Sequence, residues 1–239
     1  MKRALLALGF VAGLTGPAQA RIGDSAVVEL FTAQGCAPCV KVGDEVNELA
    51  GRPKTIVVTW PVDYWDYLGW KDTFAQPEFD DRQRAYDHRF GFRDVFTPQV
   101  VVDGDIQGSG AQPGKLEEMI RQTRRELRDP PQMSFIGTDR VAVGSGPRPK
   151  RPADVWLVRY DPREQSVDVK TGDNRGKTIT QKDVARQLVR LGLWRGSPRV
   201  FHLPASPAEG LTTLVLLQED RGGKILAADE KPTAPSPPS

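Results

Sequence analysis

The chain has 239 residues, with 33 Lys and Arg against 31 Asp and Glu, and 38% of its residues are hydrophobic. A net charge this close to zero provides no basic surface for nucleic acid or for an anionic membrane, so neither is an expected partner. The length exceeds what one small domain needs and suits two domains of ordinary size.

The N-terminus has the three regions of a secretory signal peptide. Lys2 and Arg3 precede an apolar run at 4–14, and the small residues Ala18 and Ala20 follow it. Cleavage after Ala20 would leave 219 residues with 31 basic and 31 acidic side chains. The apolar run is too short to span a bilayer. We therefore expect a periplasmic or secreted protein without a membrane span, in an oxidising compartment where cysteine pairs rest as disulfides.

The only two cysteines of the chain follow an apolar run at 26–31, in the order Gly35-Cys36-Ala37-Pro38-Cys39. The run predicts a buried strand, and residues 40–50 predict a helix. A cysteine at the start of a helix meets unpaired N–H groups and the positive end of the helix dipole, which favour the thiolate. Cys36 is therefore the expected nucleophile. Cys39, one turn further in, is the expected resolving cysteine.

Other kinds of site also use the Cys-x-x-Cys spacing. Zinc would need two more ligands, and the soft candidates His88 and His202 lie far apart in the sequence, so we expect neither a metal nor a cofactor. A purely structural disulfide would close a very short loop and stabilise little. Two thiolates would suit Cu(I), but the chain has only three Met and two His. A redox pair is the favoured interpretation; a copper-handling thiol protein and a non-catalytic binding module are the alternatives.

Strand and helix signals alternate through the next part of the chain. Residues 54–60 predict a second buried strand, and strand-helix-strand implies a right-handed parallel crossover. Residues 77–89 predict a helix that ends at Gly91. An apolar strand then begins at Pro98 and turns back at Asp103-Gly104. A last helix is predicted at 113–127 from its apolar periodicity.

An aromatic-rich stretch between these elements, residues 61–72, has neither strand alternation nor a long helical period. Its Tyr and Trp side chains bury area while keeping a polar group, which suits recognition of a partner near the cysteines. Filling of the core by Trp65 and Trp70 is the alternative interpretation. The candidate substrate-binding residues are Asp63, Tyr64, Trp65, Asp66, Tyr67 and Trp70.

The pattern changes after Pro130-Pro131. Short β-rich runs separated by turns predict a smaller, mostly antiparallel β domain at 131–229. Residues 183–191 fit a helix or a strand equally. No catalytic set is visible there, so this domain is expected to position a partner, to cap the first domain or simply to pack. Residues 230–239 are rich in proline, lack an apolar anchor and predict a disordered tail.

The order of elements at 21–130, with the Cys-x-x-Cys after the first strand and Thr97-Pro98 before the hairpin, resembles the thioredoxin fold. Residues 28–36, 62–72, 82–86 and 160–196 are similar to a bacterial family of secreted thioredoxin-like proteins, catalogued as domain of unknown function 1223. The resemblance implies an α/β thioredoxin-like domain at 21–130.

The same resemblance implies roles for three further residues. Thr97 and Pro98 would form a cis peptide bond whose backbone faces the disulfide, a bond that is cheap only before proline. Glu29, a charge inside the first strand, would move the proton of the resolving cysteine; a salt bridge is the alternative. Thioredoxin has Trp before its first cysteine and Gly-Pro between the two. This chain has Gly35 and Ala37-Pro38 there, so a redox potential is not carried over.

Together these observations predict a periplasmic or secreted thiol-disulfide oxidoreductase. It would exchange the Cys36–Cys39 disulfide with a protein or a small thiol. A periplasmic electron donor or acceptor is a further expected partner. The direction of electron flow does not follow from the sequence pattern.

Overall fold

The computed structural model describes residues 25–112, 114–123 and 130–231. The predicted signal peptide and residues 232–239 of the predicted tail lie outside these ranges, whereas Glu230 and Lys231 belong to the last strand. Within the described part, no helix is long and apolar enough to cross a membrane.

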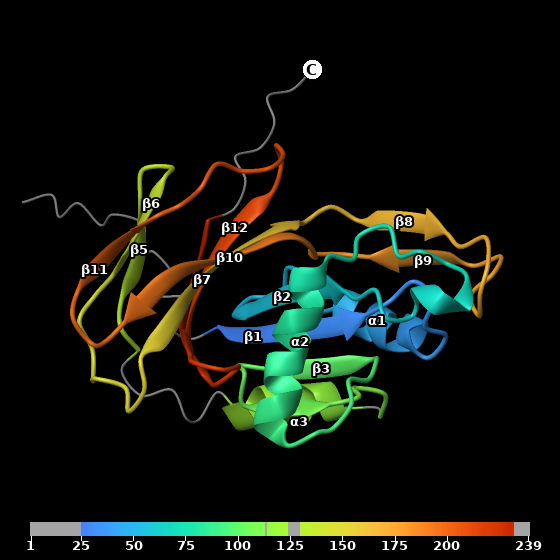
Figure 1. Cartoon of the computed structure of the whole chain (residues 1–239), viewed down its shortest axis with the longest axis horizontal. Helices are drawn as coiled ribbons and strands as arrows, with labels where there is room; N and C mark the ends of the chain where they lie inside the picture. Colours follow the sequence, from blue (N-terminus) through green and yellow to red (C-terminus); the bar gives the residue numbers. More distant parts are fainter. Residues whose placement is uncertain (1–24, 113, 124–129, 232–239) are drawn as a thin grey trace, which may run out of the picture.

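One mixed sheet of eight strands connects the N-terminal and C-terminal parts of the described chain (Figure 1). Its strand order is β13-β12-β7-β10-β2-β1-β3-β4. The strands are β1 (Ala26–Thr32), β2 (Thr55–Pro61), β3 (Gln99–Val102), β4 (Ile106–Gly108), β7 (Ala153–Asp161), β10 (Val184–Trp194), β12 (Thr212–Glu219) and β13 (Ile225–Lys231).

This sheet corrects the predicted fold class. The expected α/β thioredoxin-like domain followed by a smaller antiparallel β domain is wrong, because strands of both halves form a single, mostly β structure. β10 pairs with β2 in parallel at Val184 and Thr59, and the Thr59 N–H donates to the Asp183 carbonyl at 2.9 Å. The physical reason is that β2 is buried along nearly its whole length and needs a neighbour on each side.

Residues 183–191, which fitted a helix or a strand, are therefore part of the strand β10. The domain boundary expected between residues 130 and 131 stays a prediction, since a sheet shared by both parts does not show whether either part could fold alone.

Two smaller sheets complete the β structure. β5 (Met133–Ile136), β6 (Arg140–Val143) and β11 (Arg199–His202) form one of them. β8 (Gln165–Asp168) and β9 (Thr178–Gln181) form a hairpin that extends from β7 and β10 toward α1 (Cys39–Asn47) (Figure 1). Asn47 of α1 holds this hairpin: its Nδ2 donates to the Thr180 carbonyl at 3.0 Å, and its Oδ1 accepts from the Lys182 N–H at 3.0 Å.

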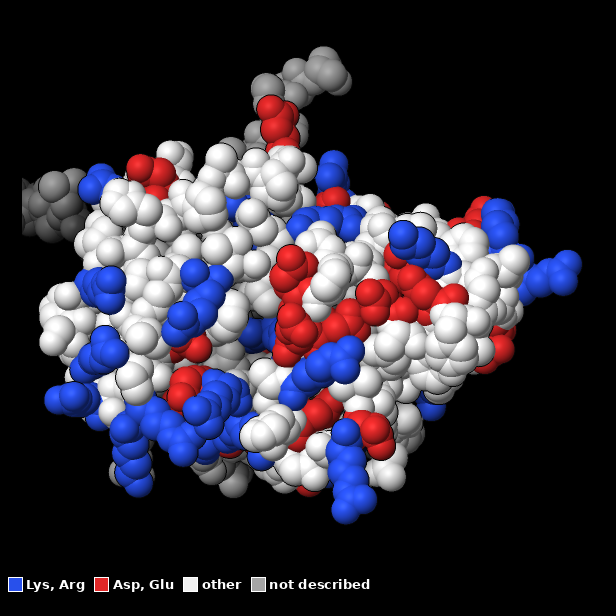
Figure 2. Space-filling model, in the orientation of Figure 1, with Lys and Arg blue, Asp and Glu red and all other residues white. Residues whose placement is uncertain are grey.

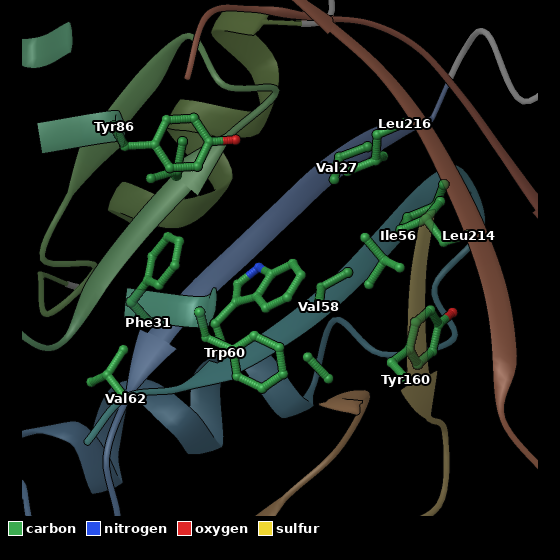
Figure 3. Close-up of a cluster of buried hydrophobic side chains, with 14 of the residues drawn as sticks. Val27, Phe31, Ile56, Val58, Trp60, Val62, Tyr86, Tyr160, Leu214 and Leu216 are labelled. Atoms are coloured by element: carbon green, nitrogen blue, oxygen red, sulfur yellow. The ribbon is translucent and has the colours of Figure 1, made fainter. Parts of the chain in front are cut away.

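Three α-helices are described, and they cover the β2-β1-β3-β4 part of the sheet. α2 (Pro77–Phe90) packs on one face, where Tyr86 meets Phe31 and Trp60 lies close by (Figure 3). α1 and α3 (Lys115–Thr123) pack on the other face. Neighbouring residues of β1 point to opposite faces, and all seven residues are buried, so both faces of this strand are covered.

Several local predictions are confirmed. α2 begins at Pro77, which suits the first helical position, and ends at Gly91, whose φ of 79° few other residues adopt readily. β3 and β4 form the predicted hairpin, and Asp103 and Gly104 at its turn both have positive φ. α3 lies within the predicted range 113–127, of which 113 and 124–127 are outside the described residues.

Candidate functional site

Cys36 and Cys39 form a disulfide in the turn between β1 and α1. Cys39 is the first residue of α1, and its N–H donates to the Cys36 carbonyl at 3.2 Å. The pair therefore lies at the N-terminal end of a nine-residue helix. The first N–H groups of a helix lack intrahelical partners, so they favour a thiolate at this position.

Both cysteines are buried, with 1% of Cys36 and 3% of Cys39 exposed. In the oxidised protein, Cys36 is thus no more exposed than Cys39, although the cysteine that reacts with a partner is expected to be the more accessible one. The assignment of Cys36 as nucleophile and Cys39 as resolving cysteine stays a prediction.

Trp65 lies beside the cysteine turn and accounts for part of this burial. A Cβ atom placed on Gly35 would be 3.7 Å from the Trp65 Cβ, and the Trp65 Nε1 donates to the Thr97 Oγ1 at 2.6 Å. The Thr97–Pro98 peptide bond is cis, as predicted, and both residues are buried. Trp65 therefore connects the cysteine turn to the Thr97–Pro98 turn.

Gln34, two residues before Cys36, joins the turn to two distant segments. Its N–H donates to the Asp72 Oδ2 at 2.7 Å, and its carbonyl accepts from the Asn174 Nδ2 at 2.9 Å. Its side chain accepts from the Trp70 Nε1 and donates to the Thr73 Oγ1, both at 2.9 Å. Residues 62–76, which we call the aromatic segment, are thereby fixed against the cysteine turn.

These contacts of Gln34 were missed from the sequence. Asp72 and Asn174 stand within the stretches that resemble the family, but a polar residue there gives no sign of its partner. Burial raises the pKa of the Asp72 carboxyl to about 6, although N–H groups of Gln34 and Phe74 lower it.

The six predicted substrate-binding residues differ in exposure and in their contacts, and their binding role stays a prediction. Tyr67 is 78% exposed and stacks on Trp65 with ring centroids 6.4 Å apart, and Asp63 is exposed. Trp70 donates a hydrogen bond to Gln34, and the Asp66 Oδ1 accepts one from the Asp72 N–H at 3.0 Å. Trp70 and Asp66 therefore make contacts within the protein. The Tyr64 hydroxyl is buried without a hydrogen-bond partner among the described residues, and burial raises its pKa.

Acidic side chains gather over α2 and the aromatic segment (Figure 2). Residues 62–81 contain six Asp and Glu but only one Lys. Asp80 is buried, and within the described residues neither of its carboxylate oxygens has a hydrogen-bond partner. Burial, with the charge of Asp63, raises the pKa of Asp80 to about 6. The face of the molecule beside the disulfide therefore has a negative potential.

Glu29 forms a buried ion pair with Arg82 of α2. The Arg82 Nε lies 2.5 Å from the Glu29 Oε1, which also accepts from the Trp60 Nε1 at 2.8 Å. The other carboxylate oxygen accepts from the Arg82 Nη2 at 3.0 Å and from the Tyr86 hydroxyl. The salt-bridge interpretation of Glu29 is thus confirmed, in the middle of β1. The observed bonds join its carboxylate to Arg82, Trp60 and Tyr86, so the acid/base role stays a prediction without geometric support.

A metal site is not evident in the described part of the chain, where no group of three or more His, Cys, Asp and Glu side chains is placed to hold an ion.

Comparison with known proteins assigns the sequence to a family. Residues 27–218 match the family described as "Protein of unknown function (DUF1223)". The chain belongs to this family. A search of curated proteins gave no match for this DUF1223 protein.

Solved structures show that its fold is shared. A crystal structure of a protein from Agrobacterium tumefaciens is 29% identical, with a TM-score of 0.73, and the match covers 93% of this chain and 99% of that one. HBP35 of Porphyromonas gingivalis is 10% identical with a TM-score of 0.61, covering 90% of this chain and 77% of that one, and shows likeness of fold alone.

Proposed function

We propose that this DUF1223 protein is a periplasmic or secreted thiol-disulfide oxidoreductase whose redox-active group is the Cys36–Cys39 disulfide. The observation that supports this is the position of the bond, at the N-terminal end of α1. It closes a loop too short to stabilise the chain substantially, so a structural role accounts for it poorly.

The chemistry is exchange between a partner thiol and the disulfide. A partner thiolate attacks one sulfur of the pair, the sulfur–sulfur bond breaks, and the other cysteine leaves with the electron pair as a thiolate. The unpaired N–H groups of α1 stabilise that thiolate. Reaction with a second partner thiol then releases the oxidised partner and leaves both cysteines reduced.

A non-catalytic binding module is the second candidate. The burial of both cysteines and the 78% exposure of Tyr67 beside Trp65 favour it, because the exposed ring offers binding area while the sulfurs are shielded. The acidic face next to these rings would suit a basic partner.

A turnover assay tests the proposal. We expect the protein with residues 1–20 removed to accelerate exchange between dithiothreitol and 2-hydroxyethyl disulfide by at least about tenfold over the uncatalysed rate. The variants Cys36→Ser and Cys39→Ser should lose this acceleration. The double variant Cys36→Ser/Cys39→Ser is the control. A wild-type rate equal to that of the double variant would contradict the proposal, and copper bound at one ion per reduced protein would instead favour copper handling.

A further inference from the structure

A cavity of about 120 Å³ lies beside Cys39, between α1 and the hairpin β8–β9. Cys39 and Gly43 of α1 line it, together with the C-terminal part of β1, Thr59 of β2 and the whole of β9. Asp44, which is exposed, is also among its lining residues. Cys36 does not line the cavity. The cavity therefore reaches the disulfide from the Cys39 side, whereas Trp65 lies against the turn near Gly35 and Cys36.

Gln181 of β9 gives the cavity a polar wall. Its side chain is 5% exposed, and its Oε1 has no hydrogen-bond partner among the described residues. Buried polar atoms in native proteins are almost always paired, so an unpaired acceptor in a residue that lines the cavity favours a ligand with a donor group. The carboxylate of Asp44 would favour the same kind of ligand, one with an N–H or O–H group.

We infer that the exchange partner is a small thiol bearing an amine or hydroxyl group, and that it enters this cavity and reacts at Cys39, not at Cys36 as expected from the sequence. This inference rests on the proposed function and specifies its substrate class. A water molecule occupies about 30 Å³ in the liquid. The cavity thus admits a small organic molecule and excludes a polypeptide segment.

The reaction is balanced with two molecules of the thiol. The first thiolate attacks the Cys39 Sγ, the bond to Cys36 breaks, and Cys36 leaves as a thiolate that takes up a proton. The second thiolate attacks the small-thiol sulfur of the mixed disulfide, and Cys39 leaves as a thiolate that takes up the second proton. The sum converts the protein disulfide and two thiols into the protein dithiol and one small disulfide, and the reverse sequence oxidises the protein.

Filling the cavity tests the route of entry. Gly43 has a φ outside the left-handed region, and a Cβ placed there would meet nothing within 4 Å, so larger side chains can occupy the cavity space. We expect Gly43→Leu to slow reduction of the disulfide by cysteamine by about tenfold or more relative to Gly43→Ala. Gly43→Ala is the matched control, since it makes the same change from glycine within a helix but leaves most of the cavity empty.

Trapping experiments test the site of attack without depending on the Gly43 variants. Reduced Cys36→Ser, in which Cys39 is free, should form a mixed disulfide with cystamine about tenfold faster than reduced Cys39→Ser, measured by intact mass. Faster trapping at Cys36, or equal rates for Gly43→Leu and Gly43→Ala, would overturn the inference. The proposed oxidoreductase function would still stand if the wild-type protein catalysed turnover. Absence of wild-type turnover together with no mixed disulfide at either cysteine would overturn both.

Discussion

Arg82→Ala should lower the free energy of unfolding by about 3–5 kcal/mol, the usual effect of removing one partner of a buried ion pair. The side chain of Arg82 is 4% exposed and that of Glu29 is fully buried, so the variant would leave the Glu29 carboxylate without its counter-ion. Burial disfavours the charge of Arg82, but the neighbouring Glu29 raises its pKa, which keeps the guanidinium charged. Urea unfolding followed by tryptophan fluorescence measures the loss.

Arg84→Ala is the matched control, because Arg84 is exposed on the same helix and its truncation should change stability by no more than about 0.5 kcal/mol. The double variant Glu29→Gln/Arg82→Met removes both charges and should recover much of the loss. It should also retain the wild-type exchange rate if Glu29 has no acid/base role. A loss below about 1 kcal/mol for Arg82→Ala would contradict the buried ion pair.

Gln34→Ala should accelerate reduction of the Cys36–Cys39 disulfide by about 10- to 100-fold. The substitution leaves the Trp70 Nε1 and the Thr73 hydroxyl without their partner at Gln34. An unsatisfied buried group costs about 1–3 kcal/mol, and each 1.4 kcal/mol changes a population about tenfold. The aromatic segment should therefore open more often and expose the cysteine turn. Quenching with an alkylating reagent during reduction by excess dithiothreitol, followed by mass measurement, gives the rate.

Leu217→Ala separates local opening from general destabilisation. Leu217 is fully buried in β12, within the cluster that packs against the three-stranded sheet, and its truncation should cost about 2–5 kcal/mol of global stability. We expect this variant to reduce much more slowly than Gln34→Ala under native conditions. Equal acceleration in the two variants would mean that reduction proceeds through global unfolding, and that Gln34 does not hold a local cover.

The parts of the fold that were predicted correctly have local signals. A buried apolar run gave β1, Pro77 and Gly91 bounded α2, and Asp103-Gly104 gave the turn of the β3–β4 hairpin. The pairing of β2 with β10 has no such signal. Thr59 and Val184 are far apart in the sequence, and the residue pattern of a strand does not identify the strand with which it pairs. This one pairing joins strands of the two expected domains in a single sheet.

The candidate site divides in the same way. The cysteine pair is predictable because its spacing is a property of the local sequence, and the cis bond at Thr97–Pro98 was expected from the resemblance and is possible because the bond precedes proline. The contacts of Gln34 with Asp72 and Asn174 are not, since a buried amide can bond to any polar group that the fold brings to it. Glu29 fitted a catalytic acid or an ion pair, and only the position of Arg82 distinguishes the two.

The most direct test of a redox-active disulfide is its equilibrium with a thiol buffer. The protein would be incubated in graded ratios of reduced to oxidised glutathione, alkylated, and weighed by mass spectrometry, with circular dichroism recorded on the same samples. We expect Cys36 and Cys39 to interconvert reversibly between disulfide and dithiol while the fold is retained in both states. Reduction that occurs only once the fold is lost would show that the bond is structural and would contradict its role in exchange.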